Sequence, residues 1–238
     1  MKHFRFLLIL LTTAVVMFPS AQSQTYEISV WGFQIGEVNI HTPTSDSMSV
    51  RATSTGIVDI IFPFDNDYIT TFDSTTYACT SYRKSVKQGT FEQKLTCVWD
   101  ESSHEFNYKK YDRVSREEKH HNIFSLFSRV HHTPLSELDT KWFLMEHEGS
   151  SFRARFLWAD SMNLFVGSDS ISSNHFRLDV FPANKKNVKI LDQTDYFSRN
   201  ITHQKGVRQL WVERGGDKHI LQASFTLSGI PIKIQMKP

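Results

Sequence analysis

Hydrophobic and polar residues alternate along the C-terminal part of the chain, from Arg208 to Pro238. The apolar residues take every second position in two runs: Leu221, Ala223, Phe225 and Leu227, then Ile230, Ile232, Ile234 and Met236. A period of two places one side of a strand against a core and the other side in water. This segment therefore predicts neighbouring strands, joined by glycine turns at Gly215-Gly216 and Ser228-Gly229.

The same alternation continues through most of the chain. It predicts further strands over residues 26–33, 35–41, 47–54, 56–61, 68–73, 104–111, 142–148, 151–160, 162–166 and 175–181. Turns are expected at Phe33-Gln34 and over 63–67. Short connections favour antiparallel neighbours in sequence order. The fold class predicted is all-β: a strongly curved antiparallel sheet or open β-barrel of roughly ten or more strands.

One segment breaks the alternation and predicts the only helix. Apolar residues at 123, 124, 126, 127 and 130 form one helical face. Asn122 is a suitable N-cap, and Thr133-Pro134 is a stop signal. The expected helix covers 122–130 and is wrapped by the sheet. The residues expected to pack on the sheet are Ile123, Phe124, Phe127 and Val130.

The N-terminus has the composition of an export signal. Lys2 and Arg5 precede an apolar run over 6–18, and small residues, Ala21 and Ser23, follow. The run is shorter than the roughly 20 residues of a membrane span, so cleavage near Ser23 is predicted. No cysteine follows the run to accept a lipid anchor. We therefore expect residues 24–238 to form a single domain in the periplasm or outside the cell, with no transmembrane span in the mature chain.

Charge and histidine content indicate neither a nucleic-acid partner nor a metal. Removal of 1–23 takes two of the 27 basic residues, which leaves 25 basic and 25 acidic residues. The pairs His120-His121 and His131-His132 flank the predicted helix, whose length keeps them apart if it is straight. We interpret them as solvated helix flanks, and we interpret Asp65 and Asp67 as parts of a polar turn and not as calcium ligands. No metal and no cofactor are expected.

Two cysteines lie in consecutive predicted strands. If Lys87-Gln88-Gly89 form the loop between them, Cys79 faces Cys97 across the hairpin, within reach of a disulfide. Export to an oxidising compartment favours that bond. The alternative is two buried free thiols.

The aromatic residues carry the most functional information. A curved sheet closed by a helix is a common way to build a cavity for an acyl chain or another apolar ligand. The side chains that would line such a cavity are Trp31, Phe124, Phe127, Phe156, Trp158, Trp211 and Phe225. The alternative is that they fill a solid core.

Several short motifs resemble the bacterial secreted family known as domain of unknown function 3108. They are the opening Tyr-X-Ile-X-Val-Trp-Gly-Phe-Gln-Ile-Gly at 26–36, Ser125-Leu-Phe-Ser-Arg-Val with Pro134-Leu135, Phe176-Arg-Leu-Asp-Val, and Leu210-Trp211-Val-Glu-Arg with the strand Ile-Pro-Ile-Lys-Ile. The chain departs from the family after Trp211, where Gly-Gly-Asp-Lys-His-Ile-Leu-Gln intervenes and the proline comes later, at Pro231. The resemblance implies a β-sheet protein of the periplasm or surface with no assigned activity. Its expected shape is similar to the lipoprotein-localisation carriers, whose half-barrel and helix hold acyl chains.

The function expected from the sequence is that of a non-enzymatic envelope protein. The sequence has no Gly-X-Ser-X-Gly elbow and no Walker loop, and a hydrolase would need polar groups that converge in a cleft. The protein is expected to bind a lipid or other apolar ligand in its half-barrel. The alternative is a structural or protein-interaction module with a solid core and an exposed apolar patch or strand edge.

Overall fold

The computed structural model describes residues 22–183, 187–227 and 229–238. The predicted export signal lies outside the described residues, apart from Gln22 and Ser23. These two residues begin the first strand, β1.

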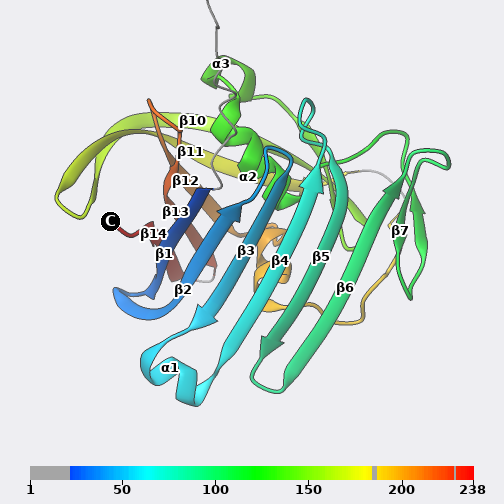
Figure 1. The fold of residues 1–238 in the computed structure, drawn as a ribbon, viewed down its shortest axis with the longest axis horizontal. Helices are drawn as coiled ribbons and strands as arrows, with labels where there is room; N and C mark the ends of the chain where they lie inside the picture. The colour runs from blue at the N-terminus through cyan, green and yellow to red at the C-terminus, as the bar shows by residue number, and fades with distance from the viewer. Residues whose placement is uncertain (1–21, 184–186, 228) are drawn as a thin grey trace, which may run out of the picture.

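Every strand belongs to one antiparallel sheet, which confirms the predicted fold class (Figure 1). The sheet has 14 strands in the order β8-β7-β6-β5-β4-β3-β2-β1-β14-β13-β12-β11-β10-β9. Their bounds are β1 Gln22–Val30, β2 Phe33–Thr42, β3 Ser47–Ser54, β4 Phe64–Phe72, β5 Cys79–Gln88, β6 Phe91–Asp100, β7 Glu105–Tyr108, β8 Arg113–Ser115, β9 Phe143–His147, β10 Ser150–Val166, β11 Asp169–Pro182, β12 Val207–Glu213, β13 Ile220–Leu227 and β14 Ile230–Met236. Consecutive strands are neighbours throughout, except that β8 and β9 form the two ends and β1 pairs with β14 in the middle.

The sheet curves until its two ends approach each other, and the chain between them covers the gap. The segment from His120 to Asn122 runs beside the edge of β9, where His121 N donates to Leu144 O at 2.9 Å and Glu146 N donates to His121 O at 2.8 Å. On its other side, Cys79 N at the start of β5 donates to His120 O at 2.8 Å. The exposed edge of β9 is thus paired, as buried backbone requires.

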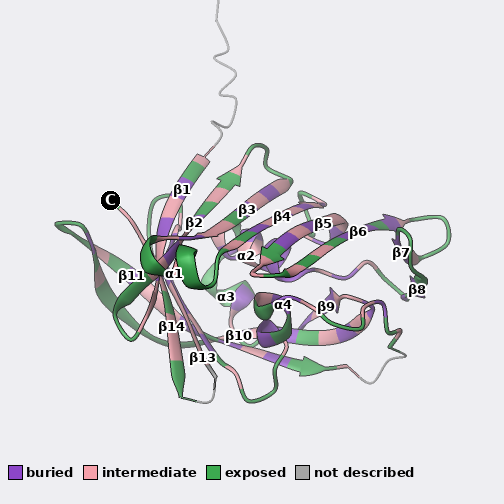
Figure 2. Cartoon of the chain, turned by 90° about the horizontal axis from the view of Figure 1, so that it is seen from below, coloured by how far each residue is buried: buried purple, intermediate pink, exposed green. Residues whose placement is uncertain are grey.

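The predicted helix is present as α2, Ile123–His132, two residues longer at its C-terminus than predicted. Asn122 is its N-cap, as predicted. Figure 2 shows α2 and α4 between the wall of β1–β6 and the wall formed by β9 and β10. The structure adds three short helices to the single predicted one: α1 Gly56–Ile61, α3 Leu135–Leu138 and α4 Tyr196–Ile201.

The main core fills the space between α2 and the inner faces of the strands. Leu126 and Phe156 are fully buried there, and Ile123, Phe124 and Val130 of α2 are nearly so. Phe127 is only partly buried against the same core. A second cluster around Leu95, Trp99 and Phe106 packs under β6–β8.

Local predictions failed where turn geometry decided the outcome. The first hairpin turns at Trp31-Gly32, with φ of 49° and 83°, and not at Phe33-Gln34. Two consecutive residues with positive φ form a tight turn whose twist matches that of the strands. Residues 56–61 form α1 and not a strand, and the predicted turn over 63–67 is mostly the start of β4. The expected separate strands 151–160 and 162–166 are parts of one strand, β10.

Candidate functional site

The N-terminus of α2 is anchored in the centre of the barrel by its cap. Asn122 Oδ1 accepts a hydrogen bond from Ser125 N at 2.8 Å, and Ser125 Oγ accepts one from Asn122 N at 3.0 Å. The Asn122 amide nitrogen also donates to Thr70 Oγ1 at 2.7 Å and to Cys79 Sγ at 3.3 Å. One side chain therefore satisfies the end of the helix and attaches it to β4 and β5.

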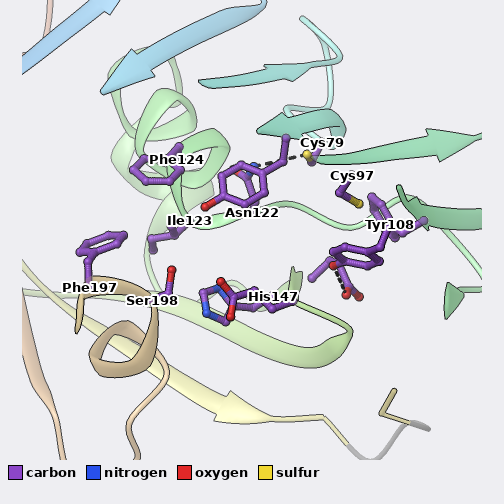
Figure 3. Close-up of a pocket in the computed structure, with 13 residues that line it drawn as sticks. Cys79, Cys97, Tyr108, Asn122, Ile123, Phe124, His147, Phe197 and Ser198 are labelled. Atoms are coloured by element: carbon purple, nitrogen blue, oxygen red, sulfur yellow. Dashed lines mark hydrogen bonds between the residues drawn. The ribbon is translucent and has the colours of Figure 1, made fainter. Parts of the chain in front are cut away.

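A small cavity lies beside this cap, and Figure 3 shows the side chains that surround it. Its volume is about 20 Å³. The residues that line it are Cys79, Tyr82, Cys97, Phe106, Tyr108, Asn122, Ile123, Phe124, Glu146, His147, Glu148, Phe197 and Ser198. That volume holds about one water molecule, whereas a site for a small organic ligand is about 300 Å³ or larger. This cavity is too small for such a ligand.

Both cysteines lie at this cavity as free, buried thiols, and the predicted hairpin register was wrong. The loop between β5 and β6 is the two-residue turn Gly89-Thr90, because Gln88 pairs with Phe91. This register places Cys97 opposite Tyr82 instead of Cys79. Burial raises the pKa of the Cys79 thiol to about 12, and burial also raises that of Cys97. Thiols in such surroundings are poor nucleophiles.

A fully buried lysine lies close to the cavity. Lys84 projects inward from β5, and its Nζ donates to Asp195 Oδ2 at 2.9 Å, to Thr194 Oγ1 at 2.8 Å and to the Glu148 carboxylate. Asp195 is the N-cap of α4 and accepts from Ser198 N at 3.0 Å, while Glu148 lies in the turn before β10. Lys84 thus connects β5, the turn before β10 and the N-terminus of α4.

The electrostatics of this cluster follow from its burial and its pairing. Burial raises the pKa of Asp195, but the attraction of Lys84 and the hydrogen bonds from Ser198 outweigh it and lower the pKa overall. Tyr68 donates to Asp195 Oδ1 at 2.9 Å, and burial raises the Tyr68 pKa well above its ordinary value. The tyrosine remains protonated and the aspartate ionised at neutral pH.

A second buried ion pair lies under β7 and β9. Arg116 Nε donates to Glu146 Oε2 at 2.8 Å, and Tyr108 donates to Glu146 Oε1 at 2.7 Å. The backbone nitrogen of Gly149 donates to the same carboxylate at 2.9 Å. Burial raises the pKa of Glu146 despite Arg116. Each of these groups bonds to Glu146, so the arrangement is a hydrogen-bonded network that supports the fold.

Of the four histidines expected to be solvated helix flanks, His132 is exposed, whereas His120 is buried and His121 and His131 are partly buried. His120 is fully buried, with its ring 6.3 Å from that of Phe106. The ring nitrogens of His121 lie 3.2 Å from Leu144 O and 3.1 Å from Thr76 O. Burial lowers the pKa of both His121 and His131 to about 4. Among the described residues, no group of three or more His, Cys, Asp or Glu side chains is arranged to hold a metal.

A larger depression of about 550 Å³ lies on the outer, polar face of β3–β6. Its charged side chains are Arg51, Asp65, Asp67, Lys87, Glu92 and Lys94. Two ion pairs cross it: Arg51 with Asp65 at 2.9 Å and Lys87 with Glu92 at 3.4 Å. Three cations and three carboxylates leave no excess of either sign, and exposed pairs of this kind contribute little to binding or stability.

The most unusual surface of the molecule is apolar and lies at one end of the sheet. We define the apolar tip as six exposed side chains, with the exposed fraction given for each: Trp31 (66%), Phe33 (76%), Ile57 (71%), Ile60 (83%), Ile61 (74%) and Phe62 (53%). Two of them belong to the β1–β2 turn and its first β2 residue, and the others to α1 and the residue after it. Figure 2 shows α1 as an exposed element at this end.

The register explains why these two segments lie together. Gly36 of β2 pairs with Ser54 of β3, so the turn at 31–32 and the connection that follows Ser54 leave the sheet at the same end. Thr55 N donates to Ile35 O at 3.1 Å, which brings α1 alongside β2. None of the residues of α1 is buried, so its isoleucines project into solvent. A contiguous exposed apolar patch of this kind marks an interaction surface.

The seven aromatic residues expected to line a ligand cavity are dispersed. Of the seven, Phe124 alone lines the small cavity, Phe127 and Phe156 belong to the main core, and Phe225 is half-buried beside Arg208. Trp31 is in the apolar tip, and Trp158 is 45% exposed on β10. Trp211 stacks on His175 of the neighbouring strand, with ring centroids 4.4 Å apart, on the opposite side of β12 from the buried Leu210.

The sequence analysis did not single out Lys84 or the exposed isoleucines. The alternation of Tyr82, Lys84 and Val86 could have indicated that the lysine faces inward. The sequence Asp195-Tyr-Phe-Ser198 could likewise have indicated a helix N-cap. For residues 56–61, β-branched content favoured a strand, and the pattern gave no indication of a helix.

The fold defines a β-barrel-like protein. No family model matches the chain, and no curated protein matches it. The structure is similar to the crystal structure of a beta-barrel-like protein of domain of unknown function 1849 from Brucella abortus. The match covers 91% of this chain and 95% of that one, with a TM-score of 0.57 and 6% sequence identity. At that identity the likeness shows the fold alone, and the resemblance to domain of unknown function 3108 stays a prediction.

Within the described ranges, no helix is long and apolar enough to cross a membrane.

Proposed function

We propose that this protein is an exported, non-enzymatic binding module of the cell envelope. In this proposal its partner is contacted by the apolar tip, and its barrel interior is a solid core. The observation that carries the proposal is the contrast between six exposed apolar side chains on adjacent segments and an internal cavity of about 20 Å³. Of the two functions inferred from the sequence, this contrast favours the interaction module over the carrier of an internal ligand.

The buried polar groups support the non-enzymatic part of the proposal. Lys84 pairs with both Asp195 and Glu148, and Arg116 pairs with Glu146. Each network joins elements that are distant in sequence. Such pairing gives these groups a role in fixing the fold, and the two thiols beside them are buried and protonated.

Photo-crosslinking in cells that export the protein tests this function. A benzophenone amino acid is placed at Ile60 in the tip, at Phe124 in the interior, and at Phe165 as the control. Phe165 is 64% exposed and lies at the other end of β14, where its carbonyl accepts from Gln235 Nε2 at 3.0 Å. The proposal predicts an envelope adduct from position 60 and none from position 165.

Two results would count against it. An adduct at position 165 but not at 60 would place the binding surface elsewhere. A lipid-sized adduct at position 124 would support the carrier with an internal ligand.

A further inference from the structure

The partner that best fits the apolar tip is a lipid bilayer surface, and this inference rests on the proposed function. We infer that the tip inserts into the outer part of a bilayer that carries anionic headgroups.

The side chains of the tip are exposed to an unusual degree. Ile60 is 83% exposed and Ile61 74% exposed on a single short helix, and Phe33 is 76% exposed on the adjoining strand. A protein interface of standard size buries about 800 Å² on each partner and surrounds an apolar centre with hydrogen-bonding groups. A small group of strongly exposed apolar side chains is better matched to hydrocarbon, and tryptophan, here Trp31, is favoured at the level of the headgroups.

The single acid of α1 is held back from the apolar side chains. Asp59 Oδ1 accepts a hydrogen bond from Ser54 Oγ at 2.5 Å. Two other carboxylates on neighbouring elements are each neutralised, Asp65 by Arg51 and Glu92 by Lys87. Charge repulsion from an anionic membrane is thereby reduced at this end of the molecule.

Two more exposed apolar residues lie on strands that end at the same end of the sheet. Val30 pairs with both Phe33 and Ile232, and Thr226 pairs with both Pro231 and Val207. Val207 is 48% exposed and Ile230 39% exposed.

Cations accompany these two apolar residues. Lys205 precedes β12 and Lys233 lies in the middle of β14, and both residues are exposed. In the described part of the chain neither lysine forms an ion pair. Exposed cations beside an apolar projection complement anionic headgroups.

Vesicle flotation with the purified protein tests the inference. The vesicles are phosphatidylcholine alone or with phosphatidylglycerol, and they contain no protein. Wild type should float with both, more strongly with the anionic lipid at low salt. The variant Ile57→Gln/Ile60→Gln/Ile61→Gln should lose at least about 100-fold in partitioning, because each substitution removes an apolar side chain. The control Phe165→Gln should float like wild type.

A second readout keeps the test independent of the triple variant. Brominated lipid should quench the fluorescence of Trp31 in wild type, and the quenching should fall in Trp31→Phe. Failure of wild type to float with either vesicle overturns the inference. If Ile60 then crosslinks to an envelope protein in cells, the proposed function stands and the partner is a protein. A wild-type dimer that the triple variant cannot form would identify a second copy as the partner instead. No adduct and no flotation together would reject both proposals.

Discussion

Lys84 Nζ lies 2.9 Å from Asp195 Oδ2, and the two residues are 111 positions apart in the chain. Both side chains are completely inaccessible to solvent. The contact joins β5 to the N-cap of α4, and the same Nζ also bonds to Glu148 in the turn between β9 and β10, so Lys84 links the two walls that enclose the core. A buried charge pair is costly to break, because the remaining partner stays buried without its counter-charge.

Replacement of Lys84 should therefore destabilise the protein strongly. Lys84→Met leaves Asp195 and Glu148 without their cation, and we expect a loss of about 3–5 kcal/mol in the free energy of unfolding. The control is Lys87→Met on the same strand, which removes an exposed pair with Glu92 and should cost about 0–1 kcal/mol. Urea denaturation of both variants provides the measurement. Equal stabilities of the two would contradict the structural role of the buried network.

The cap of α2 gives a second stability prediction. Asn122→Ala removes the acceptor for Ser125 N and the donor to Thr70 and Cys79. The loss of the cap alone is worth about 0.5–2 kcal/mol. The Thr70 hydroxyl also loses a partner in the interior, so we expect a total cost of about 2–3 kcal/mol. Ser136→Ala, on the exposed surface of α3, is the control and should change the thermal midpoint little. An unchanged midpoint in Asn122→Ala would show that the cap is not needed.

Because two histidines are partly buried, the stability of the protein should fall as the pH becomes mildly acidic. Burial lowers the pKa of His121 and His131 from 6.5 to about 4 in the folded protein, with further lowering of His131 by His132 and His219. The unfolded chain takes up these protons first as the pH falls. The stabilisation is complete above about pH 6.5 and is lost between 6.5 and about 4.

Urea midpoints measured from pH 7.5 down to pH 4 should therefore decline across this window. His131→Gln should make the decline shallower, whereas His41→Gln, at an exposed position, should leave its slope unchanged. A wild-type urea midpoint that stays constant from pH 6.5 to pH 4 would refute the lowered pKa values of His121 and His131.

The two thiols give a chemical test of the corrected hairpin register. Because Cys79 and Cys97 are free and buried, a thiol reagent should label neither quickly in the native protein. Both should be labelled after denaturation without reductant. Absence of labelling in the denatured, unreduced protein would mean that the two cysteines are joined, as the sequence had suggested.

Period-two alternation was sufficient to predict an antiparallel all-β sheet, and the apolar face of 123–130 was sufficient to predict α2. Both signals are averaged over many residues and survive local errors. The position of a turn depends on one or two residues, and Trp31 shows the difficulty: a tryptophan with φ of 49° is uncommon, and its place in the turn was not predicted. The turn between β5 and β6 was also misplaced: it is Gly89-Thr90 and not Lys87-Gln88-Gly89. The wrong register that followed led to the prediction of a Cys79–Cys97 disulfide.

The candidate site was less predictable than the fold. Whether aromatic residues enclose a cavity or fill a core depends on packing in three dimensions, which the sequence pattern does not encode. Residues 56–61 could have formed a strand of the sheet, as their β-branched content suggested. Only the pairing of Gly36 with Ser54 and the contact of Thr55 with Ile35 place them outside, beside Trp31 and Phe33.

The central claim is that the tip, and not the interior, holds the protein to its partner. The most direct measurement is the fraction of exported protein that sediments with the cell envelope. The samples are wild type, the variant Ile57→Gln/Ile60→Gln/Ile61→Gln and the control Phe165→Gln, at matched thermal stability. We predict that the triple variant moves to the soluble fraction while wild type and Phe165→Gln sediment. Sedimentation of the triple variant to the same extent as wild type would contradict the account.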